Sequence, residues 1–162
     1  VLGPTLPLLR AHMPPLTEAE LARLAAIGQG LLERNARINL VSRADAAHLE
    51  ERHLLHCALA LRLHRFAPGA RVLDLGTGGG LPGLVLAATH PEADFTLLDS
   101  TQKKLRAVEA VAAAAGLANV RVAWARAEDY AAGPGRAAYD YVTGRAVARL
   151  AAFWALARPL LR

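Results

Sequence analysis

Two aspartates and a run of glycines have the spacing of a crevice that binds a nucleoside. Asp74 lies two residues before the first glycine of the pattern D-x-G-x-G-x-G, which continues through Gly76, Gly78 and Gly80. Glycines adopt positive φ readily and let a ligand approach the backbone. Asp99 ends the next apolar run, FTLLD, and an acid about 20 residues beyond a glycine turn suits the two hydroxyls of a ribose. These residues predict a site for a ligand that contains a ribose.

The residues around the glycines predict the elements that hold them. The apolar run 71–75 predicts a strand, and Pro82 marks the first position of a helix. At that position the missing N–H of proline costs nothing. A strand, a glycine turn and a helix N-terminus in this order form the ligand-binding crevice of an open α/β sheet.

Three kinds of cofactor can be weighed against this crevice. A triphosphate is excluded, because no G-K-[ST] follows the glycines. Gly78, Gly80 and Gly83 can be read as the dinucleotide pattern G-x-G-x-x-G, but the third glycine of that pattern lies inside the helix, whereas Pro82 marks the helix start here. S-adenosylmethionine (SAM) carries no phosphate, and its charges are an ammonium, a carboxylate and a sulfonium.

The polar residues match the parts of SAM in order. Asp74 suits the ammonium, directly or through water, glycine N–H groups suit the carboxylate, and Asp99 suits the ribose. The predicted strand at 120–124 is followed by ARAED, so the N–H of Ala127 and the carboxylate of Glu128 or Asp129 could recognise the adenine edge. The alternative for both aspartates is a helix cap or a solvated turn.

The first part of the chain predicts helices. Residues 1–15 are rich in proline and predict an irregular lead-in. Thr17 and Glu20 form a capping box that opens a helix to about residue 34. Ser42 with Asp45 offers a second N-cap, for a helix to about residue 65.

The second part of the chain alternates strands with helices. Strands are predicted at 71–75, 95–98, 120–124 and 139–143, and helices at 82–90, 101–116, near 128 and at 147–157. Such alternation predicts a parallel sheet with right-handed crossovers. We therefore predict one structural domain of the α/β class, in which an N-terminal helical region (1–69) packs on a Rossmann-like core (70–162), which the family resemblance described below implies to be a methyltransferase core. We expect the last strands of that core to be missing, because a strand should follow the final helix. The strand at 139–143 is then an uncovered edge.

The charge favours a polyanionic partner. The net charge is +5, and residues 34–71 hold seven arginines against three acids. We expect Arg37 and Arg43 to contact RNA phosphates, with Arg52 and His53 also facing the RNA. A solvated basic surface explains the charge equally well.

The cysteine count and the hydropathy of the chain indicate the compartment in which the protein works. A single cysteine, Cys57, allows no intrachain disulfide and indicates a reducing, cytoplasmic setting. No run is apolar enough for a membrane span, and the N-terminus makes a poor signal peptide.

His53, His56 and Cys57 share a predicted helix face, but a fourth ligand is missing, so we predict no metal site. We expect Trp124 and Trp154 in the core and the protein to be a monomer.

The central part of the chain resembles a known protein family. The segment 72–129, with its blocks VLDLGTGGGLPG and FTLLDS, resembles the RsmG (GidB) family. Flanking matches are Asn39–Leu40 ahead of Arg52–His53–Leu54–Leu55, and Arg145–Ala146 after the fourth strand. The resemblance covers about residues 35–158. It implies a SAM-dependent enzyme that methylates N7 of a guanine in bacterial 16S rRNA, within the small ribosomal subunit. It also implies cofactor contacts at Gly76, Leu81, Ala127, Glu128 and Arg145, with Asp99 close by.

The sequence departs from the family pattern in three places. His56 and Cys57 stand where the family usually has Asp-Ser, and Gly144 stands where it has Ser. The family's last strands, with their M-K-G-like segment, are absent.

The implied chemistry needs positioning rather than a base. Guanine N7 has a free lone pair, so orientation can supply much of the catalysis. No N-P-P-Y or D-P-P-Y follows the fourth strand, which argues against methylation of an exocyclic amine. Arg145 is the candidate catalytic residue, because its fork could hold the methionine end of the cofactor, guanine O6 or a phosphate. A surface ion pair with Asp140 or Glu128 is the alternative.

Two other functions stay open on the residues alone. The chain could be an NAD-type oxidoreductase or a catalytically silent binding module, because Asp99 suits either cofactor's ribose. Glu128 and the basic helical region favour the methyltransferase.

Overall fold

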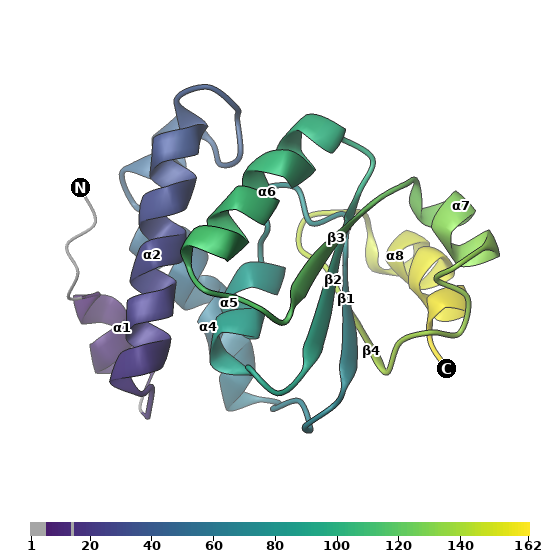
Figure 1. Ribbon diagram of the computed structural model, residues 1–162, viewed down its shortest axis with the longest axis horizontal. Helices are drawn as coiled ribbons and strands as arrows, with labels where there is room; N and C mark the ends of the chain where they lie inside the picture. The colour runs from purple at the N-terminus through teal and green to yellow at the C-terminus, as the bar shows by residue number, and fades with distance from the viewer. Residues whose placement is uncertain (1–5, 14) are drawn as a thin grey trace.

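A parallel four-stranded sheet lies at the centre of the computed structural model, which describes residues 6–13 and 15–162 (Figure 1). The strands are β1 (Arg71–Leu75), β2 (Asp94–Asp99), β3 (Val120–Trp124) and β4 (Tyr141–Thr143). Their order is β3-β2-β1-β4, and all neighbours pair in parallel. The α/β, Rossmann-like prediction is therefore confirmed.

Helices cover both faces of the sheet. On one face lie α5 (Gly83–Thr89) and α6 (Gln102–Ala114), with the N-terminal helices packed outside them, and on the other lie α7 (Ala127–Ala132), α8 (Leu150–Ala157) and the 3-10 turn Arg158–Leu160 (Figure 1). The N-terminal elements are α1 (Pro7–His12), α2 (Glu18–Asn35), α3 (Arg43–Ala46), the π-helix Glu50–Leu55, α4 (His56–Ala58) and the 3-10 turn Leu59–Arg62.

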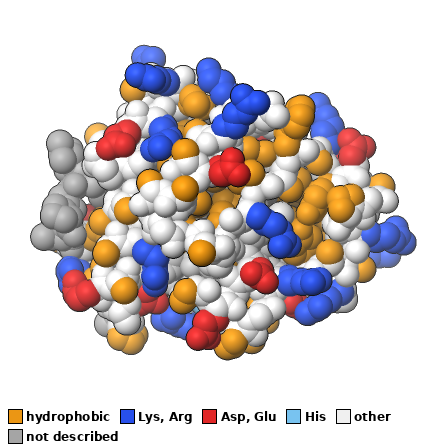
Figure 2. Space-filling model, viewed as in Figure 1, with side chains coloured by type: hydrophobic (Ala, Val, Ile, Leu, Met, Phe, Trp, Pro, Cys, Tyr) orange, Lys and Arg blue, Asp and Glu red, His pale blue; other side chains and the backbone are white. Residues whose placement is uncertain are grey.

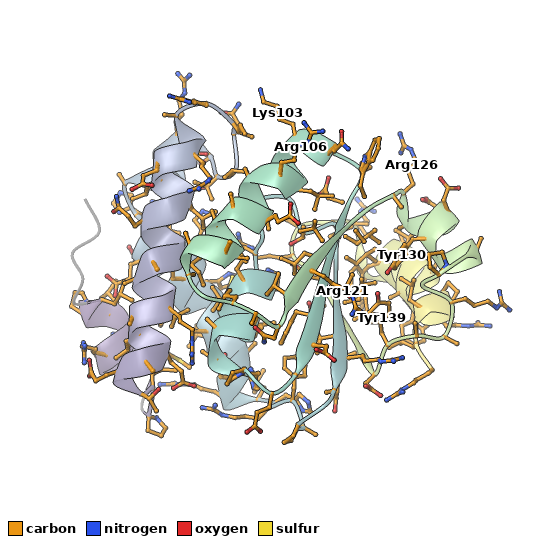
Figure 3. The ribbon with its side chains drawn as sticks, in the orientation of Figure 1. Lys103, Arg106, Arg121, Arg126, Tyr130 and Tyr139 are labelled. Atoms are coloured by element: carbon orange, nitrogen blue, oxygen red, sulfur yellow. The ribbon has the colours of Figure 1, made fainter. Side chains whose placement is uncertain are left out.

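The core follows from the alternation of side chains along the strands. Val72 of β1 faces a cluster that joins α2, α5 and α6, whereas Leu73 and Leu75 face a second cluster beneath α7 and α8. In the second cluster the hydroxyls of Tyr130 and Tyr139 are 2.6 Å apart, and Figure 3 labels this pair. A sheet apolar on both faces must be covered on both, and these two helix layers do so.

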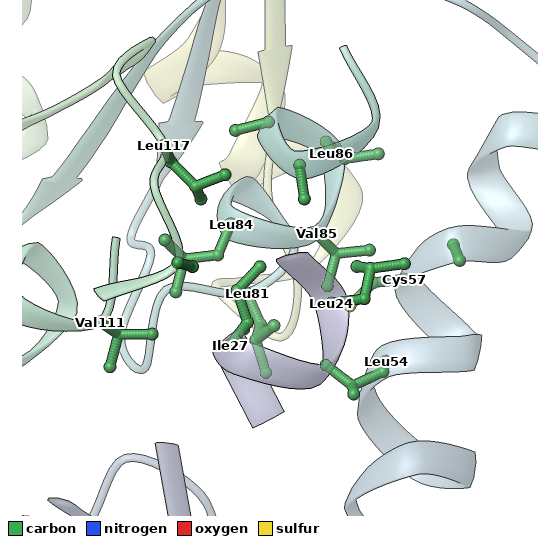
Figure 4. Packing of buried hydrophobic residues seen from close by; sticks show 14 of the residues in the cluster. Leu24, Ile27, Leu54, Cys57, Leu81, Leu84, Val85, Leu86, Val111 and Leu117 are labelled. Carbon is green, nitrogen blue, oxygen red and sulfur yellow. The ribbon is translucent and has the colours of Figure 1, made fainter. Parts of the chain in front are cut away.

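The N-terminal helices are part of the larger cluster. Thr17 and Glu20 form the predicted capping box, with Thr17 N–H donating to Glu20 Oε2 at 2.7 Å. From α2, Leu24 and Ile27 are fully buried, and Figure 4 shows them packed beside residues of α5. Apolar burial of this kind contributes roughly 25 cal/mol per Å², so it anchors the N-terminal layer to the sheet.

Two N-terminal predictions need correction. Residues 7–12, predicted as irregular, form α1, because Pro7 lies at the start of the helix, where proline is accepted. Glu50 Oε1 accepts from the N–H groups of Leu8 and Leu9 at 2.8 and 3.1 Å, a long-range cap that the sequence does not reveal. Of the rest of the predicted lead-in, residues 1–5 and 14 lie outside the described residues. The helix predicted from Ser42 to about residue 65 is broken into α3, the π-helix, α4 and a 3-10 turn.

The edge at β4 also differs from expectation. Tyr139 leaves the strand register and pairs with Leu161, and Tyr139 N–H donates to Leu160 O at 3.1 Å. The last residues therefore cover the start of this edge, which was predicted to be bare. Among the described residues, no helix is long and apolar enough to cross a bilayer.

Candidate active site

The glycine loop between β1 and α5 turns tightly at the carboxyl edge of the sheet. Gly76, Gly78 and Gly80 have φ of 66°, 54° and 88°, a region that side chains disfavour. At Gly79 the limit is space, because an added Cβ would collide with the backbone oxygen of Leu40. The predicted glycine turn is present, and it packs against the N-terminal region.

Asp74 lies behind this loop, where it is fully buried. Its Oδ2 accepts hydrogen bonds from Thr77 Oγ1 at 2.6 Å and from the N–H of Gly83 at 3.0 Å, and its Oδ1 accepts from Thr143 Oγ1 at 3.2 Å. Burial raises the pKa of this carboxyl to about 6, against the opposing effect of those hydrogen bonds. Asp74 lines neither cavity described below, and its hydrogen bonds hold the glycine loop. Its predicted contact with the ammonium, directly or through water, stays a prediction.

Asp99, by contrast, faces the crevice. Its Oδ2 accepts from Gly78 N–H at 2.9 Å, and its Oδ1 accepts from Thr101 N–H at 2.8 Å. The carboxylate therefore ties the glycine loop to the start of α6 and lines both cavities at this edge of the sheet.

A first cavity of about 130 Å³ lies over the ends of β1, β2 and β3. Leu98 and Leu156 contribute apolar wall, and Asp99, Ala127 and Glu128 contribute its polar side. These three are residues that the sequence assigned to ribose and adenine recognition. The structure thus brings them together at two neighbouring strand ends, with Asp99 at the end of β2 and Ala127 and Glu128 after β3.

A second cavity, of about 630 Å³, shares Gly76 and Asp99 with the first. Loop residues line one side, including Gly78 and Leu81. Basic side chains contribute most of the remaining lining, together with Asp45: Arg52, His53, His56, Lys104 and Arg145. Of the predicted site residues, Gly80 stays outside both linings, and it supports the loop from behind.

Arg145 holds the N-terminal region against the sheet. Its Nη2 donates to Nδ1 of His53 at 2.7 Å, and its Nη1 donates to the backbone oxygen of Arg52 at 3.4 Å. Its expected alternative, a surface pair with Asp140 or Glu128, is wrong, because Asp140 accepts from Arg162 Nε at 2.6 Å and no such contact joins Arg145 to Glu128 in the described chain.

The contacts of His53 fix its tautomer. Because an arginine can only donate, Nδ1 of His53 is the acceptor and its proton resides on Nε2. That Nε2 is buried and lies 3.7 Å from Asp45 Oδ2. Asp45 itself accepts from Ser42 Oγ at 2.6 Å and from Arg52 Nη1 at 2.8 Å. Burial, followed by the charge of Arg145, lowers the pKa of His53 against the opposing effect of Asp45, which favours the neutral imidazole.

Two other residues that are predicted to contact RNA lie away from the active-site cavities. Arg37 lines a different groove, and Arg43, the exposed first residue of α3, lines neither active-site cavity. His56 is exposed on the second cavity, whereas Cys57 is buried in the core, where burial raises the pKa of its thiol to about 12. Among the described residues no group of three His, Cys, Asp or Glu side chains could hold a metal ion.

Some residues of the site were missed or misplaced by the sequence reasoning. Thr77 and Thr143 donate hydrogen bonds to the carboxylate of Asp74, and Lys104 lines the second cavity. A threonine three residues after a strand-end aspartate was the available signal for Thr77, whereas Thr143 meets Asp74 only through the pairing of β4 with β1. Trp124 and Trp154, predicted in the core, are 63% and 54% exposed.

The fold and site define the class of Rossmann-like, SAM-dependent methyltransferases. The O-methyltransferase TomG from Streptomyces achromogenes, solved in complex with SAM, is similar with a TM-score of 0.57 and 23% identity, over 96% of this chain and 66% of that one. A methyltransferase from Geobacter sulfurreducens is similar with a TM-score of 0.59 and 18% identity, over 96% of this chain and 73% of that one. At this level of sequence identity, the structural similarity supports the assignment of the fold.

Sequence comparison narrows the class to one family. The family model GidB, described as rRNA small subunit methyltransferase G, matches residues 20–162. Ribosomal RNA small subunit methyltransferase G of Cytophaga hutchinsonii is 40% identical over 147 residues, which are 91% of this chain and 69% of the relative. The protein of that name from Bacteroides thetaiotaomicron is 43% identical over 140 residues, 86% of this chain and 66% of the relative.

The chain therefore belongs to the GidB family of small-subunit rRNA methyltransferases. It spans about two thirds of the length of these curated relatives. The methyltransferase prediction is supported over the NAD-type oxidoreductase and the silent binding module.

Proposed function

We propose that this chain transfers the methyl group of SAM to N7 of a guanine in 16S rRNA, in the cytoplasm. The observation that carries the proposal is the meeting of two cavities at Gly76 and Asp99. The first is small, and its apolar lining carries Asp99 and Glu128 beside Arg126. The second is larger, and three cations outnumber two acids in its lining: Arg52, Lys104 and Arg145 against Asp45 and Asp99. Family membership supplies the rRNA substrate class, and the guanine atom is the finer part of the proposal.

The chemistry of the first cavity fits the nucleoside half of SAM. Asp99 presents a carboxylate to the ribose hydroxyls, and Ala127 N–H with Glu128 can recognise an adenine edge. The cofactor supplies an electrophilic methyl group on a sulfonium. The glycine loop, with Gly76 and Gly78 at positive φ, offers close backbone approach to its amino-acid end.

The second cavity fits a guanosine with its phosphates. Arg145 has five N–H donors, of which two are engaged with His53 and the Arg52 backbone. Three remain for guanine O6 or a phosphate, together with Lys104 and Arg52 at the cavity wall. Arg145 then acts by positioning. It orients the substrate, and its hydrogen bonds to His53 and the Arg52 backbone fix the cavity wall.

The residues of this cavity need not accept a proton from the substrate. Guanine N7 carries a lone pair and no hydrogen, so the transfer requires alignment and exclusion of water. Nδ1 of His53 is occupied by Arg145, which agrees with a binding role for this imidazole.

The direct test uses 16S rRNA that lacks the modification, labelled SAM and nucleoside mass spectrometry. We expect labelled N7-methylguanosine with this chain and much less with Asp99→Ala. A label on another base atom, or transfer only to a small molecule or a protein, would overturn the assignment. Calorimetry that detects NAD but no SAM would overturn the cofactor.

A further inference from the structure

A separate basic groove lies between the end of α2 and the start of α6. Its volume is about 540 Å³. Four cations line it, and one acid accompanies them: Arg34, Arg37, Lys103, Arg106 and Glu33. Figure 3 labels Lys103 and Arg106 on α6, and Figure 2 shows Lys and Arg side chains gathered over this end of the molecule.

The positive charge of this groove is left largely unneutralised. Arg34 Nη1 lies 4.0 Å from Glu33 Oε2 and also donates to Gly30 O at 3.2 Å. Within residues 6–13 and 15–162, the exposed side chains of Arg37, Lys103 and Arg106 have no ion pair or hydrogen bond. Four cations against one acid leave an excess of three positive charges, which a bound polyanion would neutralise.

The groove adjoins the second cavity through both of its walls. Ile38 lines the groove, and Leu40, two residues later, lines the cavity. On α6, Lys103 lines the groove, and its neighbour Lys104 lines the cavity. A nucleic-acid strand in the groove would therefore lie next to the cavity that is proposed to hold the target guanine.

We propose that this groove binds the phosphates of the RNA strand beside the target guanine. The proposal rests on the proposed function and extends it from the cavity to the flanking nucleotides. Arginine and lysine without internal partners are the residues that contact phosphates. The apolar floor, which includes Ile38, Ala107 and Ala110, offers contact to the sugar edge. Such contacts set the register of the strand and carry no base specificity.

The test removes charge from the groove and measures RNA binding by this chain. The variant is Arg37→Gln/Lys103→Gln/Arg106→Gln, and Arg37→Gln alone gives a single-charge comparison. The matched control is Arg65→Gln/Arg136→Gln/Arg158→Gln, which removes the same charge from exposed positions outside both cavities and the groove. Binding of a 16S rRNA transcript is followed from low to high salt, and SAM affinity is measured by calorimetry.

We expect the groove variant to flatten the dependence of log K on log salt by about 0.7–0.9 for each phosphate that the variant no longer neutralises. SAM affinity and the melting temperature should match those of the control. A slope equal to that of the control would overturn the proposal. So would a weakened affinity for the whole ribosomal subunit with unchanged binding of naked RNA, because the groove would then face an acidic protein.

The same samples separate this proposal from the proposed function. If the unaltered chain methylates rRNA while the groove variant keeps the salt slope, the groove assignment fails and the enzyme assignment stands. If the slope falls as expected but the chain makes no N7-methylguanosine, the enzyme assignment fails and the groove is an RNA site.

Discussion

The guanidinium of Arg145 donates a 2.7 Å hydrogen bond to Nδ1 of His53, 92 residues earlier in the chain. The bond joins the segment after β4 to the π-helix Glu50–Leu55 and crosses the wall of the second cavity. Each residue was a candidate on sequence grounds, and the structure makes them one unit. The geometry of the cavity depends on His53 remaining an acceptor.

This dependence predicts an acid-sensitive contact. The pKa of His53 is lowered on folding, so its contribution to stability is present above the ordinary histidine range and is lost as pH falls below it. A protonated imidazole carries a proton on Nδ1 and cannot accept from Arg145. We expect the free energy of unfolding to fall between pH 7 and pH 5 more steeply in the unaltered protein than in His53→Asn, measured by urea denaturation.

The asparagine is the matched control, because it keeps an acceptor near Nδ1 and does not titrate. His53→Ala removes the acceptor and should cost about 1.5–3 kcal/mol, the range for a hydrogen bond to a charged group. Equal pH profiles for the unaltered protein and His53→Asn would show that the Arg145 contact does not depend on the state of His53.

Asp74 leads to a prediction of opposite sign. Its pKa is raised to about 6 by burial, so the folded state favours the protonated carboxyl, and stability is lost as pH rises through 6. Asp74→Asn preserves the shape and removes this penalty, which is at most about 3 kcal/mol at neutral pH. We expect Asp74→Asn to be at least as stable as the unaltered protein at pH 7.5, with the advantage shrinking towards pH 4.

The control is Asp74→Ala, which leaves the hydroxyl of Thr77 and the N–H of Gly83 without their acceptor and should destabilise the fold. SAM affinity separates the two roles of Asp74. If Asp74 only fixes the loop, the asparagine variant binds SAM normally, and a large loss of affinity would instead indicate contact with the cofactor's ammonium.

The sheet could be read from the sequence because local signals bound each strand. The run 71–75 ends at glycine, and 120–124 is a short run of alternating apolar residues, so both strands have their predicted limits. The fourth strand is shorter than predicted, because Tyr139 pairs with Leu161 instead of β1. The prolines of residues 1–15 predict an irregular lead-in, whereas Pro7 lies at a helix start, where proline is accepted.

The sequence allows many residues of the site to be predicted, but it does not predict how they are arranged in space. Asp74 and Asp99 both lie near the carboxyl ends of strands, and only the fold decides that one faces the loop and the other the cavity. The sequence carries no distance between Arg145 and His53. Trp124 was assigned to the core by its size, but it ends an edge strand, where its indole N–H donates to Ser100 O at 3.0 Å and its ring stays exposed.

Asp99 should govern cofactor affinity. We expect Asp99→Ala to weaken SAM binding by about 1.5–3 kcal/mol, since the ribose no longer has a charged acceptor. The glycine loop is also released, because Gly78 N–H no longer has an acceptor. Asp94→Ala is the matched control, at the exposed, opposite end of the same strand. Calorimetry with SAM that gives equal affinities for both variants would remove Asp99 from the site.

Gly83, the first residue of α5, tests how closely the helix must approach the sheet. An added Cβ would run into the Leu97 side chain and lie 2.8 Å from Asp74 Oδ2. Alanine is no poorer a helix former than glycine, so we attribute a loss of stability in Gly83→Ala to packing. We expect a loss of about 1–3 kcal/mol in urea unfolding, as for other overpacked sites, with weaker SAM binding because the loop is displaced.

The matched control is Gly133→Ala, where the added Cβ would make only an ordinary 3.5 Å contact with Asp129 O. Gly133 is the C-cap of α7, with φ of −124° and ψ of −118°, so its alanine variant changes a backbone position without crowding and should lose less stability than Gly83→Ala. The comparison contrasts a crowded Cβ position with an open one. If Gly83→Ala proved as stable as Gly133→Ala, α5 could move away from β2 at little cost. The buried Asp74–Gly83 hydrogen bond would then not be what sets the shape of the loop.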